Sequence, residues 1–155
     1  MKKQILATVC CIFLMNVSIK AQNCDPLTAP KLKDMLTQMG YTVKDLETAV
    51  GKEKYSVDIT TSALNVPLAF ELSPSKNFIW LTVNLGKPSA DTSVTNYAIL
   101  KENFAIQPCQ FYINSKGNLM MGMAVENRGV TSAIMKRHTD KIVGDVSSTT
   151  ALWQK

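Results

Sequence analysis

The sequence predicts a single α+β domain in which helices lie mainly on one face of an antiparallel sheet, in α-β-β-β-α-β-β-α order. Five segments alternate apolar with polar residues, as half-buried strands do. Three others repeat apolar residues at the spacing of an amphipathic helix. The chain is 46% hydrophobic and 19% charged, which excludes intrinsic disorder. One-faced strands and one-striped helices bury their apolar sides by packing against each other.

The first helix is expected over residues 29 to 39. Pro30 suits its first turn, and Gly40 suits a left-handed C-terminal cap. The residues expected to face the sheet are Leu32, Met35, Leu36 and Met39.

Three strands are expected next, over residues 55 to 60, 65 to 72 and 78 to 85. The last two are separated by residues 73 to 77, Ser-Pro-Ser-Lys-Asn, whose residue types favour turns. Two alternating segments joined by such a short loop form a hairpin.

A second helix is expected from Asp91 onward, with Asp91, Thr92 or Ser93 as its N-terminal cap. This helix ends before the second hairpin, which begins at Cys109. Its apolar positions are Val94, Tyr97, Ala98, Leu100 and Phe104.

The second hairpin pairs residues 109 to 113 with residues 119 to 125 across a turn that contains Gly117. The last helix begins near Thr131, and Gly144 is expected to kink or end it. Its apolar side carries Ile134, Met135, His138, Ile142 and Val143.

Residues 1 to 21 resemble a secretory signal peptide. A basic start precedes an apolar run from Ile5 to Met15, and Ala21 would be the last residue removed. The run is shorter than the roughly 20 apolar residues that span a bilayer, so no stable membrane span is expected after cleavage. The alternatives are a buried N-terminal helix and a lipid anchor at Cys24. Residues 22 to 155 would form the mature domain, which is then periplasmic or secreted.

Removing this segment changes the charge and the cysteine count. Three of the 17 basic residues are lost, so 14 remain against 12 acidic ones and the net charge falls from +5 to about +2. The basic excess therefore belongs mostly to targeting, and nucleic acid is not expected as a partner. Cys24 and Cys109 remain, and in an oxidising compartment they either form one disulfide or stay separate thiols.

Five positions in the second half of the chain match the pattern of a known fold. They are Leu100 and Asn103 near the end of the second helix, Gly117 in the hairpin turn, and Val130 and Thr131 at the start of the last helix. Together with the order of elements over most of residues 29 to 145, they resemble the type III secretion chaperone-like fold, which YbjN-type proteins share. The resemblance implies an adaptor that binds other proteins. Members are usually cytoplasmic and acidic, whereas this chain carries a signal sequence and is slightly basic.

The residues indicate no catalytic, metal or cofactor site. His138 is the single histidine, and the chain has neither a Gly-x-Ser-x-Gly nucleophile motif nor a phosphate-binding glycine loop. One histidine and two distant cysteines cannot supply a zinc site. Cys109 lies on the apolar side of a strand, where burial makes a thiol inert. We therefore expect a protein that is not an enzyme and uses no cofactor.

Apolar side chains on the side of the sheet away from the helices are the candidate partner-binding patch. If Ile79 and every second residue after it point to the helices, Phe78 and Trp80 point away from them. Tyr112 and Met120 point the same way on the second hairpin. The four side chains either form one exposed apolar patch or cover one another across the strands.

Two functions from different classes remain open. The favoured one is an exported, non-enzymatic binding or adaptor module that holds a partner protein or a second copy of itself. The alternative is a small exported ligand carrier or enzyme with a cavity between sheet and helices. Polar groups that converge on such a cavity would favour the second function, and a closed apolar core would favour the first.

Overall fold

The computed structural model describes residues 25–88 and 92–154, and its strands form one sheet. All neighbouring strands are antiparallel, in the order β1-β2-β3-β4-β6-β5. The predicted α+β class and the two predicted hairpins, β3–β4 and β5–β6, are confirmed. In chain order the elements are α1 (Ala29–Gln38), β1 (Lys44–Glu47), β2 (Lys54–Thr60), β3 (Asn65–Leu72), β4 (Phe78–Gly86), α2 (Thr92–Glu102), β5 (Gln110–Ile113), β6 (Leu119–Glu126), α3 (Ser132–Ser148) and α4 (Thr150–Trp153).

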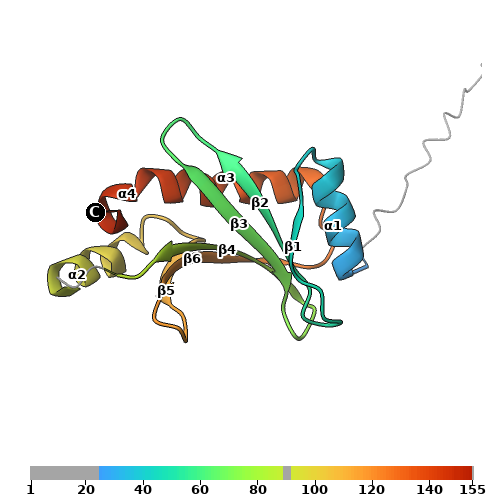
Figure 1. Ribbon diagram of the computed structural model, residues 1–155, viewed down its shortest axis with the longest axis horizontal. Coiled ribbons are helices and arrows are strands. Elements are labelled where there is room, and N and C mark those ends of the chain that lie inside the picture. Colours follow the sequence, from blue (N-terminus) through green and yellow to red (C-terminus); the bar gives the residue numbers. More distant parts are fainter. Residues whose placement is uncertain (1–24, 89–91, 155) are drawn as a thin grey trace, which may run out of the picture.

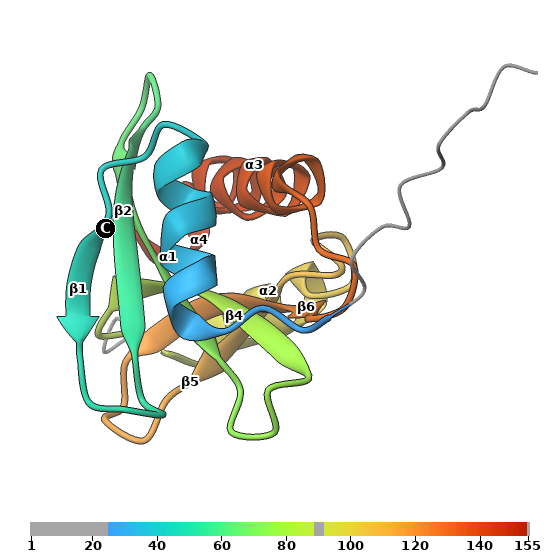
Figure 2. The ribbon, with the colours of Figure 1, turned by 90° about the vertical axis from the view of Figure 1, so that its right-hand side faces the viewer.

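Helices α1 and α3 lie on the same side of the sheet, which curves around them (Figure 2). Helix α3 runs along the length of the molecule, with α1 at one end and α2 and α4 at the other (Figure 1). We call the opposite side of the sheet the outer face. Among the described elements, no helix covers the outer face.

The core lies between the sheet and the helices. One row across four strands, Val57, Leu68, Val83 and Met121, is at most 2% exposed. Side chains of this size each stabilise the fold by roughly 1.5–3 kcal/mol when they are fully buried. The helices contribute Leu32, Leu36, Met135, Ile142 and Val146, all fully buried.

The predicted ends of α1 and the start of α3 are confirmed. Gly40 has φ +88°, and its N–H and that of Tyr41 donate to the carbonyls of Thr37 and Leu36. This pair of hydrogen bonds ends a helix at a residue with positive φ, a conformation that glycine adopts without strain. Thr131 caps α3, because its side-chain oxygen accepts a hydrogen bond from the Ile134 N–H at 3.2 Å.

Three details differ from the prediction. Strand β1 was not expected, because all four of its residues are exposed and show no alternation. Helix α3 continues through Gly144 to Ser148, since packing of Ile142 and Val146 on either side outweighs the weak helix propensity of glycine. A short helix, α4, follows it. The predicted caps of α2 rest on residues whose side chains lie outside the described part.

A buried amide ties the N-terminal arm to the sheet. The Asn127 side chain, which is 0% exposed, accepts from the Leu27 N–H and donates to the carbonyls of Leu27 and Lys76, at 2.9 to 3.0 Å. Its backbone N–H donates to the Asn77 carbonyl at 2.7 Å. Asn127 therefore joins the end of β6, the β3–β4 turn and the segment that leads into α1.

Replacing Asn127 with alanine is expected to lower the free energy of unfolding by about 2–4 kcal/mol, because three partly buried backbone groups lose the hydrogen bonds of a fully buried amide. Urea unfolding of the wild type and variant measures the difference. Asn118→Ala is the matched control, since Asn118 hydrogen bonds through its backbone in an exposed turn. Equal stabilities of the Asn127 and Asn118 variants would show that the amide is dispensable.

Candidate partner-binding surfaces

The structure places the four residues of the predicted patch on the outer face, but not as one cluster. Tyr112 and Met120 are direct cross-strand partners on β5 and β6. Trp80 lies between Glu71 and Ala124, and Phe78 lies opposite Glu126 at the far end of β4. Phe78 is 43% exposed, whereas the other three are half-buried.

The Tyr112 ring covers the neighbouring strand. A Cβ atom placed on Gly122 would lie 3.0 Å from the Tyr112 Cε1 atom and 3.3 Å from the Leu81 carbonyl oxygen. Burial, and next the charge of Glu71, raise the pKa of Tyr112 above its usual value. The edge of the Tyr112 ring therefore lies against β6 at Gly122, and part of this aromatic side chain is covered by its own sheet.

A hollow of about 470 Å³ lies on the outer face, and we call it the outer-face hollow. Its floor is small and polar: Ser56 and Thr82 are 8% and 6% exposed, with Ala69 between them in the register. The remaining lining residues come from β1 to β4, the β5–β6 turn and β6, and they are Leu46, Lys54, Pro67, Asn84, Asn114, Ser115, Lys116, Asn118 and Met120.

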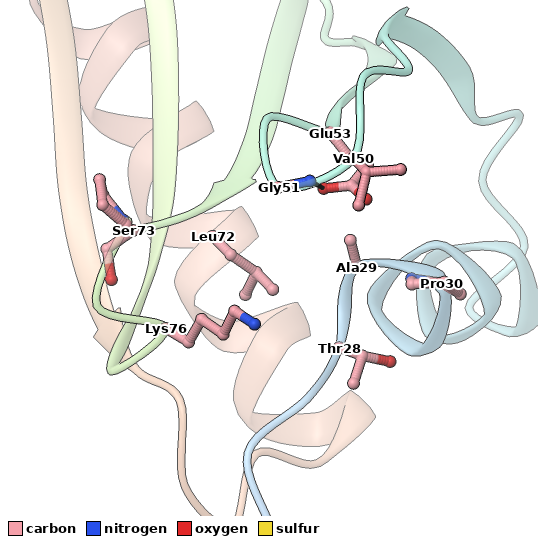
Figure 3. Close-up of a pocket in the computed structure, with 10 residues that line it drawn as sticks. Thr28, Ala29, Pro30, Val50, Gly51, Glu53, Leu72, Ser73 and Lys76 are labelled. Atoms are coloured by element: carbon pink, nitrogen blue, oxygen red, sulfur yellow. Dashed lines mark hydrogen bonds between the residues drawn. The ribbon is translucent and has the colours of Figure 1, made fainter.

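A smaller hollow, about 200 Å³, lies between the start of α1 and two turns of the sheet (Figure 3). Leu72 and Lys76 reach toward α1 from one side, and Glu53 lies on the other side (Figure 3). The Glu53 carboxylate accepts from the Gly51 N–H, and the Ser73 hydroxyl oxygen accepts from the Phe78 N–H. Polar groups here are thus engaged in their own turns, and the volume is below the roughly 300–1,000 Å³ of small-molecule sites.

A second apolar surface, which the sequence patterns did not indicate, lies at the α2 end of the molecule. Tyr97 and Leu100 on α2 and Phe104 in the turn that follows it are 73%, 67% and 85% exposed, and we call the three the α2 stripe. Ile99 is 7% exposed and anchors the opposite side of the helix. The stripe has the spacing of a core-facing stripe, so the sequence alone gave no sign that it faces outward.

A groove of about 280 Å³ separates α2 from the β5–β6 hairpin. Leu100 borders it on the helix side, and Ile113, which is 55% exposed, borders it on β5. Within the described residues, four of the seven exposed large hydrophobic side chains belong to the α2 stripe or to Ile113. Concentrated apolar exposure of this kind marks protein-binding surfaces.

The edge of β5 is closed by a side chain. The Asn103 side-chain oxygen accepts from the Phe111 N–H at 2.7 Å, and its amide nitrogen donates to the Phe111 carbonyl at 3.3 Å. These are the two bonds that a neighbouring strand would make. A strand added at this point of β5 would have to displace the Asn103 side chain from Phe111.

Within the described residues, the ionisable and sulfur groups named below do not form a nucleophile–base pair or a metal site. Burial, and next the Asp145 carboxylate, raise the pKa of Cys109 to about 12, so its thiol stays protonated and inert at neutral pH. Burial and the charge of Arg137 lower the pKa of His138. Among residues 25–88 and 92–154, no three His, Cys, Asp or Glu side chains come close enough to hold a metal ion.

Cys109 is 1% exposed, with its Sγ atom 3.7 Å from the Met123 Sδ atom. Cys24 lies outside the described residues, so the Cys24–Cys109 disulfide stays a prediction. Among the residues that the structure describes, no helix is long and apolar enough to cross a bilayer.

Among the comparisons with known proteins, the one with solved structures finds similar chains. No protein-family profile and no curated protein matches the chain. A chain of the HopA1–SchA chaperone–effector complex is similar in structure, with a TM-score of 0.53 and 10% identity, over 79% of this chain and 89% of that one. A chain of the heterodimeric ExoU–SpcU complex from the type III secretion system of Pseudomonas aeruginosa has a TM-score of 0.49 and 15% identity, over 78% and 96%.

The first similarity confirms the predicted type III secretion chaperone-like fold. At 10% identity it carries the fold alone, and the kinship with YbjN-type proteins stays a prediction.

Gly122→Ala is expected to destabilise the protein by about 1–3 kcal/mol, because the added methyl group collides with the Tyr112 ring and a backbone carbonyl. Gly144→Ala is the matched control, since a Cβ there meets nothing within 4 Å and alanine stabilises a helix by roughly 0.5–1 kcal/mol. Thermal unfolding should thus shift in opposite directions for the two variants. A stabilised Gly122→Ala variant would mean that the ring does not rest on β6.

Stability is expected to fall as the pH rises above 9. The pKa of Cys109 is raised from 9.0 to about 12 in the folded state, so the thiol ionises at lower pH in the unfolded chain. Between these two pH values, ionisation favours the unfolded state over the folded one. Urea unfolding of the reduced protein at several pH values in this window measures the loss. Cys109→Ala, although less stable overall, should show a shallower decline, and identical slopes would contradict the buried thiol's role.

Proposed function

We propose that this protein is an exported, non-enzymatic binding module that holds an extended segment of a partner polypeptide on the outer face of its sheet. The observation that supports it most is the outer-face hollow, which crosses the strands on the side that no described helix covers. Half-buried Trp80, Tyr112 and Met120 give the same face an apolar component. The fold shared with a chain of a chaperone–effector complex supports a partner-binding role.

The lining of the hollow indicates the chemistry of that segment. Lys54 and Lys116 line it, and no carboxylate does. Lys54 forms an ion pair with Glu71 at 3.0 Å, so its charge is balanced. The excess positive charge then belongs to Lys116 and to nearby Lys87, whose ammonium group donates to the Lys116 carbonyl. Hydroxyl and amide groups on the floor and rim can bond a peptide backbone. The segment is therefore neutral or acidic, with short side chains toward the floor.

The competing function, a ligand carrier or enzyme, has less support. Sheet and helices meet in a core of fully buried aliphatic and methionine side chains. The hollow between α1 and the sheet is small, and its Glu53 and Ser73 side chains accept hydrogen bonds within their own turns. The buried thiol of Cys109 is too weakly acidic to act as a nucleophile.

Export rests on residues 1 to 21, which have the basic start, apolar run and small exit residue of a signal peptide. Expression of the full chain in a bacterial host, followed by intact mass measurement, should give a mature protein that begins at Gln22 in the envelope or medium fraction. Recovery of the uncleaved chain in the cytoplasm would contradict export.

Partner binding is tested with the mature chain and partners crosslinked to it in the native envelope or medium fraction. Lys116→Glu and Met120→Asp should weaken the affinity for an identified partner about tenfold each, which corresponds to the roughly 1–2 kcal/mol of a moderate interface contact. Lys31→Glu, on an exposed position of α1, is the matched charge control. Unchanged affinity in both outer-face variants, with circular dichroism like that of the wild type, would refute the proposed site.

A further inference from the structure

Two hydroxyl groups on the floor of the outer-face hollow have no hydrogen-bond partner within the part of the chain that the structure describes. They belong to Ser56 and Thr82, which are 8% and 6% exposed, so more than nine-tenths of each residue is buried. The exposure that remains is toward the hollow, which both residues line. By contrast, the Thr61 hydroxyl, next to β2, donates to the Leu64 carbonyl at 2.9 Å. A nearly buried hydroxyl without a partner lacks a bond that a bound molecule can supply.

The two hydroxyls lie in a row of small residues that crosses the strands, and we call it the floor row. Its members, each paired with the next, are Ser56 on β2, Ala69 on β3, Thr82 on β4 and Gly122 on β6. Larger side chains stand on either side of the row, Trp80 on one side and Met120 on the other. Neighbouring strands lie about 4.8 Å apart, so the row is roughly 14 Å long. An extended segment that follows it therefore crosses the strands.

The lining of the hollow offers more hydrogen-bond donors than acceptors. The Asn84 side-chain oxygen accepts from the Gly86 N–H at 3.0 Å, which leaves its amide nitrogen as a donor. The Asn114 side-chain oxygen accepts from two backbone N–H groups of its own turn. Lys116 adds an ammonium group, and no carboxylate lines the hollow. Since hydroxyls can also donate, the lining suits a ligand whose free polar groups are carbonyl oxygens.

A proline-rich segment has this composition of polar groups. Proline has no backbone N–H, so its residues bring a carbonyl acceptor without a donor that needs a partner. Such segments adopt the polyproline II helix, which makes no internal hydrogen bonds and rises about 3.1 Å per residue. About five residues therefore match the floor row in length. Leu46, Pro67 and Met120 give the lining an apolar part that can contact proline rings.

We infer that the outer-face hollow recognises a proline-rich segment, which crosses β2, β3, β4 and β6 along the floor row and accepts hydrogen bonds from the hydroxyls of Ser56 and Thr82. The inference rests on the proposed function, because it names the class of segment held at the same site. Recognition of this kind leaves the sheet intact, since the strands beneath the row are already paired with each other. The preformed polyproline II conformation also lowers the entropy that binding costs.

Fluorescence anisotropy tests the class of segment. The probe is a labelled peptide of three Pro-Pro-Ala repeats, and the control is a labelled Gly-Ser peptide of the same length and charge. The mature chain should bind the proline peptide about tenfold more tightly than the control. Equal affinities, or no binding of the proline peptide, would overturn the inference. If Lys116→Glu and Met120→Asp still weakened the affinity for a crosslinked partner, the proposed function would stand without it.

Substitutions on the floor test the hydroxyls. Ser56→Ala and Thr82→Val remove them with little change of shape, and each should weaken the affinity for the proline peptide about threefold to tenfold. Thr60→Val, on the same face but outside the lining, is the matched control and should bind like the wild type. Wild-type affinity in both floor variants would show that the hydroxyls take no part.

Filling the hollow tests the position of the peptide. Ala69→Leu should abolish binding of the proline peptide, because the larger side chain occupies the middle of the floor row. Ala124→Leu, at an exposed position of β6 outside the lining, is the matched control, and circular dichroism checks the fold of both variants. Undiminished binding by a folded Ala69→Leu variant would overturn the inference.

A nitroxide label on the peptide tests its direction. A label at one end should broaden the amide resonances of β2, and a label at the other end should broaden those of β6. Labels that broaden the same strands from both ends would show that the segment runs along the strands, and would overturn the crossing geometry.

Discussion

The buried amide of Asn127 holds together three segments that are far apart in the sequence. An amide suits this place because it accepts and donates at once, and a carboxylate or a hydrocarbon of the same size would leave a backbone group unpaired in a dry environment. Leu27 lies two residues before α1, so the bond fixes where the helix starts over the sheet. Lys76 lies in the β3–β4 turn, so the same amide also fixes the end of the central hairpin.

The placement of α1 and α3 leaves the protein with one closed face and two open surfaces. These helices bury their stripes against the sheet, which completes the core. The outer face then has to be stable in contact with water, and its small residues and half-buried aromatics serve that purpose. Helix α2, at the end of the molecule, buries Ile99 but turns Tyr97 and Leu100 outward, and Phe104 in the following turn is exposed as well. The surfaces available to partners are thus those that the core does not use.

The sequence predicted the strands of the two hairpins because their residues alternate strictly, and burial on one side requires that period. Strand β1 lacked this signal, since an edge strand with all four residues exposed needs no apolar side. The outward direction of Trp80 and Tyr112 followed from the same alternation. Their separation did not, because it depends on the pairing of β4 with β6, and only the register shows which residues face each other.

Helix α2 shows a different limit of prediction from the sequence. Tyr97, Leu100 and Phe104 have the spacing of a core stripe, and the spacing predicts a shared side without stating what covers it. Among the α2 side chains that the structure describes, Ile99 is the buried one, and one buried residue gives no period. The position of the helix at the end of the sheet, which no local pattern encodes, left the stripe without a covering layer.

Both edges of the sheet carry features that obstruct pairing with a strand of another chain. At one edge Asn103 occupies the backbone groups of Phe111. At the other, β1 is short, bulged between Asp45 and Glu47, and rich in charge. Open edges let chains stack strand upon strand without end, which is the route to fibrils. With both edges obstructed, strand-to-strand stacking of copies would first have to displace these groups, which disfavours fibril formation.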